Sequence, residues 1–180
     1  MNHPLSLRHR WQNGWVIVVA CPGQGSQTPG FLAPWLELDG VAEQLAEFSD
    51  AAEVDLIKHG TESDADTIRD TRIAQPLIVA ASMVAGKQLM LRAGRRPDGL
   101  AGHSVGELAA VAAAGVIPGI DAMRLVGIRG RAMADAAAQV PTGMSAVLGG
   151  DADEVLALLD RLGVRAASVD QIVAATCGPA

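Results

Sequence analysis

The sequence predicts an α/β protein built from two structural units, and three observations lead to this class. The apolar run Trp15–Ala20 is typical of a buried strand, and a glycine-rich loop follows it directly. Leu100 and Ala101 end a second short strand, after which Gly102–Gly106 leads into a helix. Beyond Pro141 the elements change from long helices to the order strand, helix, strand, strand.

Composition narrows the classes of protein that fit. Of the 180 residues, 49% are hydrophobic and 19% charged, so the chain can bury a core and wholesale disorder is excluded. A net charge of −6 and only 3% aromatic residues argue against a nucleic-acid partner. Cys21 and Cys177 are too few for a disulfide scaffold, which favours a cytoplasmic protein with reduced thiols. No apolar run reaches the roughly 18 residues of a membrane span, so we expect no membrane partner.

The start of the chain has two interpretations. Arg8 and Arg10 precede the apolar run that ends on Cys21, which superficially resembles a signal peptide with a lipid-modified cysteine. Secretory apolar regions usually need about 7–15 residues, and this run is at the short limit. A loose tail over residues 1–13 before a buried strand is the preferred interpretation.

Helical spacing follows the first loop. Three apolar residues recur at i, i+4 and i+7, namely Val41, Leu45 and Phe48. We expect Asp39 to cap that helix, and Asp50 with Glu53 to begin a second one that Gly60 closes. Residues 61–71 are polar and predict a loop or a short helical turn.

The longest predicted helix places Pro76 in its first turn, runs to Ala93 and stops at Gly94. A turn over 95–99, a helix over 105–114 ended by Gly115, and a helix over 120–138 complete the first unit. The last helix has one face of small and apolar residues whose two glycines allow close packing: Met123, Val126, Gly127, Gly130 and Ala134.

The second unit is expected to hold a strand over 144–148 and a helix capped by Asp151 with Glu154 and closed by Gly163. Strands over 164–168 and 171–175 would follow. The domain boundaries predicted from this pattern are a tail at 1–13, a first domain at 14–140 and a second at 141–180. Two strands in the first domain are fewer than the usual four to six or so. We therefore expect both domains to be incomplete in this chain.

The sharpest chemical motif is Gly102-His103-Ser104-Val105-Gly106, a G-x-S-x-G sequence between a short strand and a helix. Small residues at both ends let the chain turn sharply enough to expose the serine hydroxyl as a nucleophile. The first amides of the following helix suit a developing oxyanion. The alternative is an ordinary glycine–serine turn.

A second motif, Pro22-Gly23-Gln24-Gly25-Ser26-Gln27, directly follows the first strand, where open α/β sheets bind ligands. A phosphate loop would need a following Gly-Lys-Ser/Thr, which is missing, as is the three-glycine dinucleotide pattern. An ordinary structural turn is the remaining alternative.

Together these motifs, with Arg129-Gly130 placed 25 residues after the serine, resemble the malonyl-CoA:acyl-carrier-protein transacylase family and related acyltransferase domains. The similarity extends from about residue 16 to 162 and includes Gln75-Pro76 and the 143–149 segment. It implies an α/β-hydrolase-like large domain with an inserted ferredoxin-like small domain. It also implies transfer of a malonyl group from coenzyme A to an acyl carrier protein, without metal or other cofactor.

The resemblance implies a role for four residues. Ser104 would be the nucleophile and Arg129 would bind the malonyl carboxylate, whereas the backbone amides of Gln24 and Val105 would form the oxyanion hole. The alternative for Arg129 is a solvated helix face. A malonyl-serine ester would be the intermediate of a ping-pong reaction.

The general base does not follow the pattern. The family uses a histidine beyond the region that this sequence spans, and the chain ends 76 residues after Ser104. His3, His9, His59 and His103 are poor substitutes, so we expect this chain to be truncated and weakly active. Two alternatives stay open: a serine thioesterase or esterase, and a non-catalytic product that binds acyl-CoA or carrier protein. Malonyl and methylmalonyl substrates are not distinguished.

Overall fold

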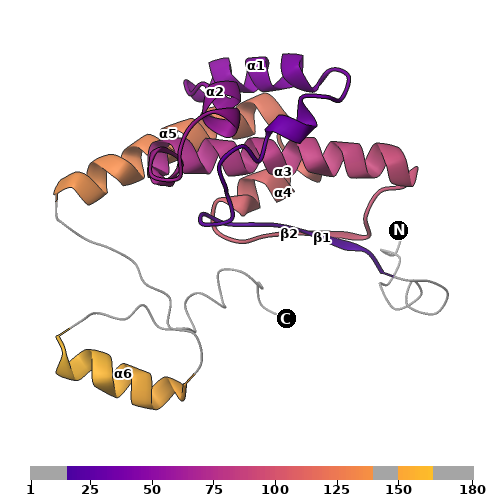
Figure 1. Ribbon diagram of the computed structural model, residues 1–180. Coiled ribbons are helices and arrows are strands. Elements are labelled where there is room, and N and C mark those ends of the chain that lie inside the picture. The colour runs from indigo at the N-terminus through magenta and orange to yellow at the C-terminus, as the bar shows by residue number, and fades with distance from the viewer. Residues whose placement is uncertain (1–15, 140–149, 164–180) are drawn as a thin grey trace. The chain divides into compact units, whose positions relative to one another are not determined.

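The computed structural model describes residues 16–139 and 150–163, and the chain divides into two compact units at residues 136 and 137 (Figure 1). In the first unit a small sheet lies on one side. Helices α3 (Thr71–Ala93) and α4 (Gly106–Ala113) pack on it, and α1 (Val41–Ala52) and α2 (Leu56–Thr61) lie above them (Figure 1). The mixed α/β class predicted from the sequence is confirmed for this unit.

The sheet consists, in the described part of the chain, of two parallel strands, β1 (Val18–Cys21) and β2 (Gly99–Gly102). Val18 pairs with Gly99 and Cys21 with Gly102. A further bond from the His103 amide to the Cys21 carbonyl, 3.0 Å long, carries the pairing one step beyond β2. Both carboxyl ends therefore stop at the same edge, where the two motifs begin.

The starts of α1 and α2 differ from the prediction. Helix α1 follows Gly40, whose φ of 74° makes the turn, and no side chain caps it, so Asp39 is not the cap. Asp50 lies inside α1, and α2 begins instead after Asp55, whose carboxylate accepts the Lys58 amide at 3.0 Å. Gly60 lies within α2 rather than closing it. An N-cap side chain accepts a hydrogen bond from the amide two or three residues later, and several acidic residues in this segment have that spacing. The sequence alone does not decide which of them begins the helix.

Helix α3 begins earlier than predicted, so Pro76 lies beyond its first turn. The Asp70 carboxylate accepts the Arg72 amide at 2.8 Å, which begins the helix at Thr71 and leaves Pro76 inside it. The short turn predicted before it is confirmed as η3 (Thr67–Arg69), and Gly94 closes α3 with a φ of 62°. The end of the helix was predicted correctly because a left-handed closing residue is almost always glycine.

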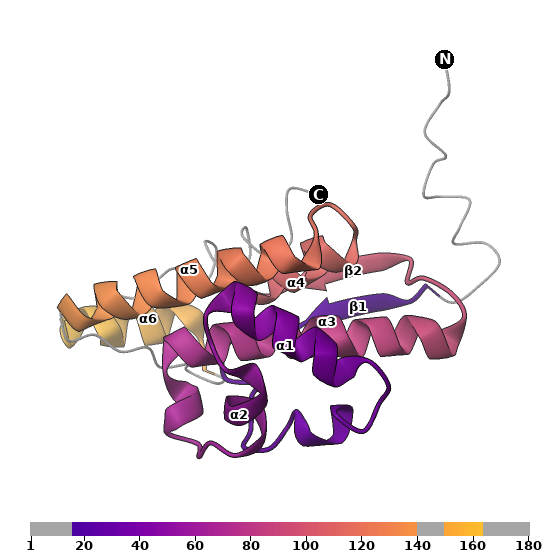
Figure 2. The ribbon, with the colours of Figure 1, turned by 90° about the horizontal axis from the view of Figure 1, so that it is seen from above.

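Among the described residues, α3 is the one helix that is long and apolar enough, by length and composition, to cross a membrane. Half of that apolar stretch is buried inside this unit, with Leu77 and Val79 fully covered. Figure 2 shows α3 running beside β1, and α1, α2 and α4 also contact it. These are the properties of the central helix of a folded core.

Helix α5 (Gly119–Gln139) packs through the predicted glycine face. A Cβ atom on Gly127 would lie 2.4 Å from the carbonyl oxygen of Ala52, and one on Gly130 would lie 3.0 Å from that of Thr71. The α5 backbone therefore approaches the end of α1 more closely than a side chain at Gly127 would allow, and it lies tightly against the start of α3 at Gly130. This close approach brings Arg129, the residue before Gly130, near the start of α3.

The second unit is described through α6 (Ala152–Arg161). The Asp151 carboxylate accepts the amides of Asp153 and Glu154 at 3.0 and 3.2 Å, and Gly163 follows the helix with a φ of 65°. This helix and both of its ends are as predicted. The tail at 1–13 and the strands expected over 144–148, 164–168 and 171–175 lie outside the described residues, and the domain boundaries stay a prediction.

Candidate active site

Ser104 occupies a sharp turn between the end of β2 and the start of α4. Its φ is 53°, a left-handed conformation that is uncommon for a residue with a side chain. The residue is exposed, whereas the next one, Val105, is 1% exposed and belongs to the core. The turn therefore presents the serine outward and directs its neighbour into the core.

The two glycines of this motif are required by the space around them. A Cβ atom on Gly102 would lie 2.4 Å from the Glu107 amide nitrogen. One on Gly106 would lie 2.4 Å from the carbonyl oxygens of both Cys21 and Pro22. The first contact lies within the turn, and the second joins the turn to the end of β1. The spacing G-x-S-x-G thus follows from backbone contacts that exclude side chains.

The glycine-rich loop after β1 lies directly against the serine turn. A Cβ atom on Gly23 would lie 2.4 Å from Nδ1 and 3.0 Å from the carbonyl oxygen of His103, so the loop backbone lies against this residue. In the described part of the chain, neither the Gln24 amide nor the Val105 amide donates a hydrogen bond. The two motifs, which are some 80 residues apart in sequence, lie side by side as the sequence predicts.

Two glutamine side chains anchor this loop to the segment that begins α3. Nε2 of Gln24 donates to Oγ1 of Thr71 at 3.2 Å. Nε2 of Gln27 donates to the Ile68 carbonyl at 3.0 Å, and its Oε1 accepts the Gly25 amide at 2.9 Å. The sequence predicts a role for the Gln24 backbone but not for these side-chain anchors. The repeated glutamines in the loop were the available signal.

Arg129 extends from α5 to the serine. Its Nη2 donates to Oγ of Ser104 at 3.3 Å, and its Nη1 donates to Oε1 of Gln75 at 2.5 Å. The side chain is half-buried, and no described carboxylate forms an ion pair with it. The structure therefore brings Ser104 and Arg129 together and leaves the guanidinium charge without a protein counter-ion in the described part of the chain.

The neighbouring arginines of α5 are engaged elsewhere. Arg124 forms an ion pair with Asp121 at 2.7 Å. Arg131 donates to the Ala52 carbonyl at 2.9 Å and pairs with Glu53 at 3.3 Å. Among these three cations, Arg129 is the one bonded to the serine. The interpretation of Arg129 as part of a solvated helix face is therefore disfavoured.

Gln75 is a site residue that the sequence analysis did not assign. It is 1% exposed and is the one buried polar side chain among the described residues. Its amide nitrogen donates to Sδ of Met133 at 3.2 Å, so both ends of the amide have partners on α5. A glutamine in an apolar helix, next to a proline, was the signal in the sequence.

Two other titratable groups have a structural explanation. Nδ1 of His59 lies 2.9 Å from Oγ of Ser63. Burial raises the pKa of the Cys21 thiol, which keeps it protonated and unreactive. No group of three or more potential metal ligands occurs in the part of the chain that the structure describes.

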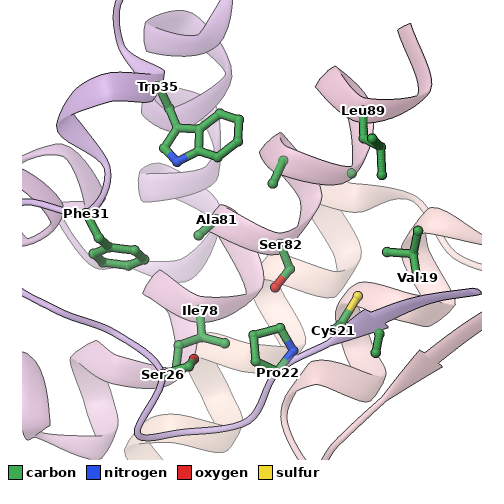
Figure 3. Close-up of a pocket in the computed structure, with 13 residues that line it drawn as sticks. Val19, Cys21, Pro22, Ser26, Phe31, Trp35, Ile78, Ala81, Ser82 and Leu89 are labelled. Atoms are coloured by element: carbon green, nitrogen blue, oxygen red, sulfur yellow. The ribbon is translucent and has the colours of Figure 1, made fainter. Parts of the chain in front are cut away.

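A separate hollow of about 440 Å³ lies between β1 and α3. Figure 3 shows Phe31 and Trp35 on one side, Val19 and Cys21 on the other, and Ser82 of α3 between them. Its lining is mostly apolar and includes neither Ser104 nor Arg129. The serine turn and this hollow thus lie on different parts of the β1 edge.

The acyl transferase domain profile matches residues 18–178, which is nearly the whole chain. The chain belongs to the acyl transferase domain family. Relatives of this acyl transferase chain include the malonyl CoA-acyl carrier protein transacylase of Mycobacterium tuberculosis, which is 52% identical over 166 residues, 89% of this chain and 55% of the relative. The Escherichia coli protein of the same name is 37% identical over 131 residues, 72% of this chain and 42% of the relative.

Solved structures agree with the family. The acyl transferase chain matches the crystal structure of MCAT from Mycobacterium tuberculosis with a TM-score of 0.76 and 53% identity, over 83% of this chain and 50% of that one. It matches a malonyl-transacylase in complex with a type II PKS acyl-carrier protein with a TM-score of 0.63 and 35% identity, over 72% and 41%. The chain spans about half the length of the curated relatives it matches.

Proposed function

We propose that this chain carries the nucleophile and the carboxylate-binding residue of an acyl-carrier-protein S-malonyltransferase. The observation that supports this most is the 3.3 Å contact between Nη2 of Arg129 and Oγ of Ser104. A malonyl group on that oxygen would have its free carboxylate one methylene beyond the ester carbonyl. A guanidinium already beside the oxygen needs only a small movement to meet that carboxylate with two parallel hydrogen bonds.

The reaction follows from these positions. Oγ of Ser104 forms a bond to the thioester carbonyl carbon of malonyl-CoA, and the bond from that carbon to sulfur then breaks. The serine proton passes to the base and then to the leaving coenzyme A sulfur. The thiol of the phosphopantetheine arm of an acyl carrier protein next gives its proton to the base, and its sulfur bonds to the ester carbonyl carbon. The bond from that carbon to Oγ of Ser104 then breaks, and the proton passes from the base to Oγ, which restores the serine. No metal or organic cofactor takes part, since the coenzyme A thioester is itself the substrate.

The oxyanion of each tetrahedral intermediate would be held by the backbone amides of Gln24 and Val105. Gln24 follows Gly23, whose backbone lies against His103, and Val105 follows Ser104 at the start of α4, which adds its partial positive charge. A donor of this kind contributes on the order of 3 kcal/mol to the transition state. The glutamine anchors on Thr71 and Ile68 would hold the loop amide in place during turnover.

The domain organisation belongs to the same proposal. Residues 14–140 would form the N-terminal part of an α/β-hydrolase-like large domain, and residues 141–180 part of a ferredoxin-like small domain. The base that accepts the Ser104 proton would be a histidine from the remaining half of the family fold. A positioned base contributes about 10²–10⁴ in rate, so acylation by this chain alone would be slow. The setting would be the cytoplasm, where fatty-acid or polyketide synthesis supplies the carrier protein.

A serine thioesterase or esterase is the second candidate, because the same turn serves hydrolysis. Incubation with malonyl-CoA and an acyl carrier protein, followed by intact mass measurement of both proteins and assay of free malonate, separates the two. The transferase predicts a malonyl adduct that disappears in Ser104→Ala and persists in the control Ser82→Ala. An adduct that survives Ser104→Ala, or free malonate formed faster than adduct and carrier-bound product, would contradict the transferase.

A further inference from the structure

The geometry points to Gln75 as a positioning residue: we infer that its amide holds Arg129 in place and thereby gives the site its preference for a carboxylated acyl group over a neutral one. This inference rests on the proposed function, because it concerns how the arginine meets a malonyl carboxylate. Gln75 itself touches neither Ser104 nor, in the proposal, the substrate.

The orientation of the Gln75 amide follows from its partners. A guanidinium has donors only, so the atom that faces Nη1 of Arg129 at 2.5 Å must be the amide oxygen. The amide nitrogen then faces Sδ of Met133 at 3.2 Å, which is a weak acceptor. Both contacts lie on α5, one turn apart, so the amide is held between two residues of a single helix face.

Burial makes this arrangement costly to disrupt. Gln75 is 1% exposed, so its amide has no access to bulk water if the contact with Arg129 is lost. A buried polar group without a partner destabilises the folded state more than the loss of a typical exposed hydrogen bond does. Gly130, beside Arg129, sets the close approach of α5 to the start of α3, which fixes the distance that the two side chains must bridge.

The neutral amide has a chemical consequence. It accepts one arm of the guanidinium without cancelling its charge, and in the described part of the chain no carboxylate pairs with Arg129. The flanking Arg124 and Arg131 are both neutralised by ion pairs. Gln75 therefore aims the arginine at Ser104 while leaving its positive charge for an anionic ligand. A glutamate at position 75 would supply the same acceptor, but its negative charge would neutralise the guanidinium.

The test measures dissociation constants of malonyl-CoA and acetyl-CoA in a Ser104→Ala background, where no acyl group is transferred. The readout is the ratio of the two constants, since a merely structural role would weaken both ligands alike. We expect Gln75→Leu, which keeps the approximate volume, to lower the preference for malonyl-CoA by about tenfold with acetyl-CoA affinity unchanged. Met133→Leu, which keeps the contact with Arg129, should change the ratio by less than about twofold.

Gln75→Glu keeps the inference testable if the leucine variant does not fold. Its carboxylate should pair with Arg129 and lower the preference for malonyl-CoA at least as far as Gln75→Leu. A preference that persists in a folded Gln75→Leu or Gln75→Glu protein overturns the positioning role and leaves the proposed function intact. If the Ser104→Ala protein with Gln75 unchanged shows no preference for malonyl-CoA, both the positioning role and the proposed function are overturned, because Arg129 would then not bind the carboxylate.

Discussion

Gly106 and Cys21 meet so closely that a Cβ atom on the glycine would lie 2.4 Å from the cysteine carbonyl oxygen. This contact joins the start of α4 to the end of β1 and brings the serine turn against the β1 loop. The neighbouring atoms are backbone, which cannot move aside as a flexible side chain can. The site geometry therefore depends on the absence of one methyl group.

Gly106→Ala should consequently destabilise the protein by at least about 1–3 kcal/mol, the usual cost of overpacking. Gly86→Ala is the matched control: Gly86 lies inside α3, and a Cβ atom there would meet nothing within 4 Å. Helix propensity predicts that this control is neutral or more stable by up to about 1 kcal/mol. Urea unfolding followed by circular dichroism measures both, and equal stability of the two variants would contradict the packing.

The backbone of Ser104 predicts an unusual ranking of substitutions. Its φ of 53° is unfavourable for any residue with a Cβ atom and acceptable for glycine. Ser104→Gly should therefore be more stable to urea than Ser104→Ala by about 1 kcal/mol. In a helix or strand the alanine variant would be the more stable one, so an equal or reversed ranking would mean that the turn is not left-handed in solution.

The caps of α3 and α1 give a paired test of the helix starts. Asp70 caps α3 through its bond to the Arg72 amide, whereas Asp39 makes no capping bond to α1. Asp70→Ala should cost about 1 kcal/mol in the free energy of unfolding, and Asp39→Ala close to nothing. Thermal melts of the two variants decide this. A larger effect at Asp39 would restore the start that the sequence alone predicts.

Cys21 should be protected from alkylation in the folded protein. Burial raises the pKa of its thiol above the ordinary value for cysteine, so the thiolate that reacts is scarce at neutral pH. In a Cys177→Ser background, iodoacetamide should modify Cys21 much more slowly than it modifies the urea-unfolded chain. The pKa of this thiol is higher in the folded protein than in the unfolded chain. Its contribution to the free energy of unfolding therefore falls as the pH rises above 9.0, where the unfolded chain loses the proton first. Rapid labelling of the folded chain would contradict the burial.

The sequence predicted best those features that depend on a few adjacent residues. The G-x-S-x-G turn, the glycine face of α5 and the Asp151 cap are local patterns, and the structure has all three. The caps of α1, α2 and α3 were not predicted, because α1 starts after the left-handed Gly40 and nearby acidic residues compete to cap α2 and α3. Only the backbone path decides among them, as Asp70 and Asp55 show.

The contacts around the site could be predicted only in part. The serine, the loop and Arg129 were found from motif spacing, but the role of Gln75 depends on how α3 and α5 pack, 54 residues apart. The Gln24 and Gln27 anchors likewise join segments more than 40 residues apart. Glutamines of this kind look like ordinary polar residues until the tertiary structure places their partners.

We propose that Arg129 selects a carboxylated acyl group for Ser104. The ratio of malonyl to acetyl adducts on the protein tests this most directly. The chain is incubated with equal concentrations of malonyl-CoA and acetyl-CoA, and intact mass gives the ratio of the two adducts. Arg129→Ala should abolish the excess of malonyl adduct, whereas Arg124→Ala, whose guanidinium pairs with Asp121, should leave it unchanged. A malonyl excess that persists without Arg129, or that disappears equally in both variants, would contradict the account.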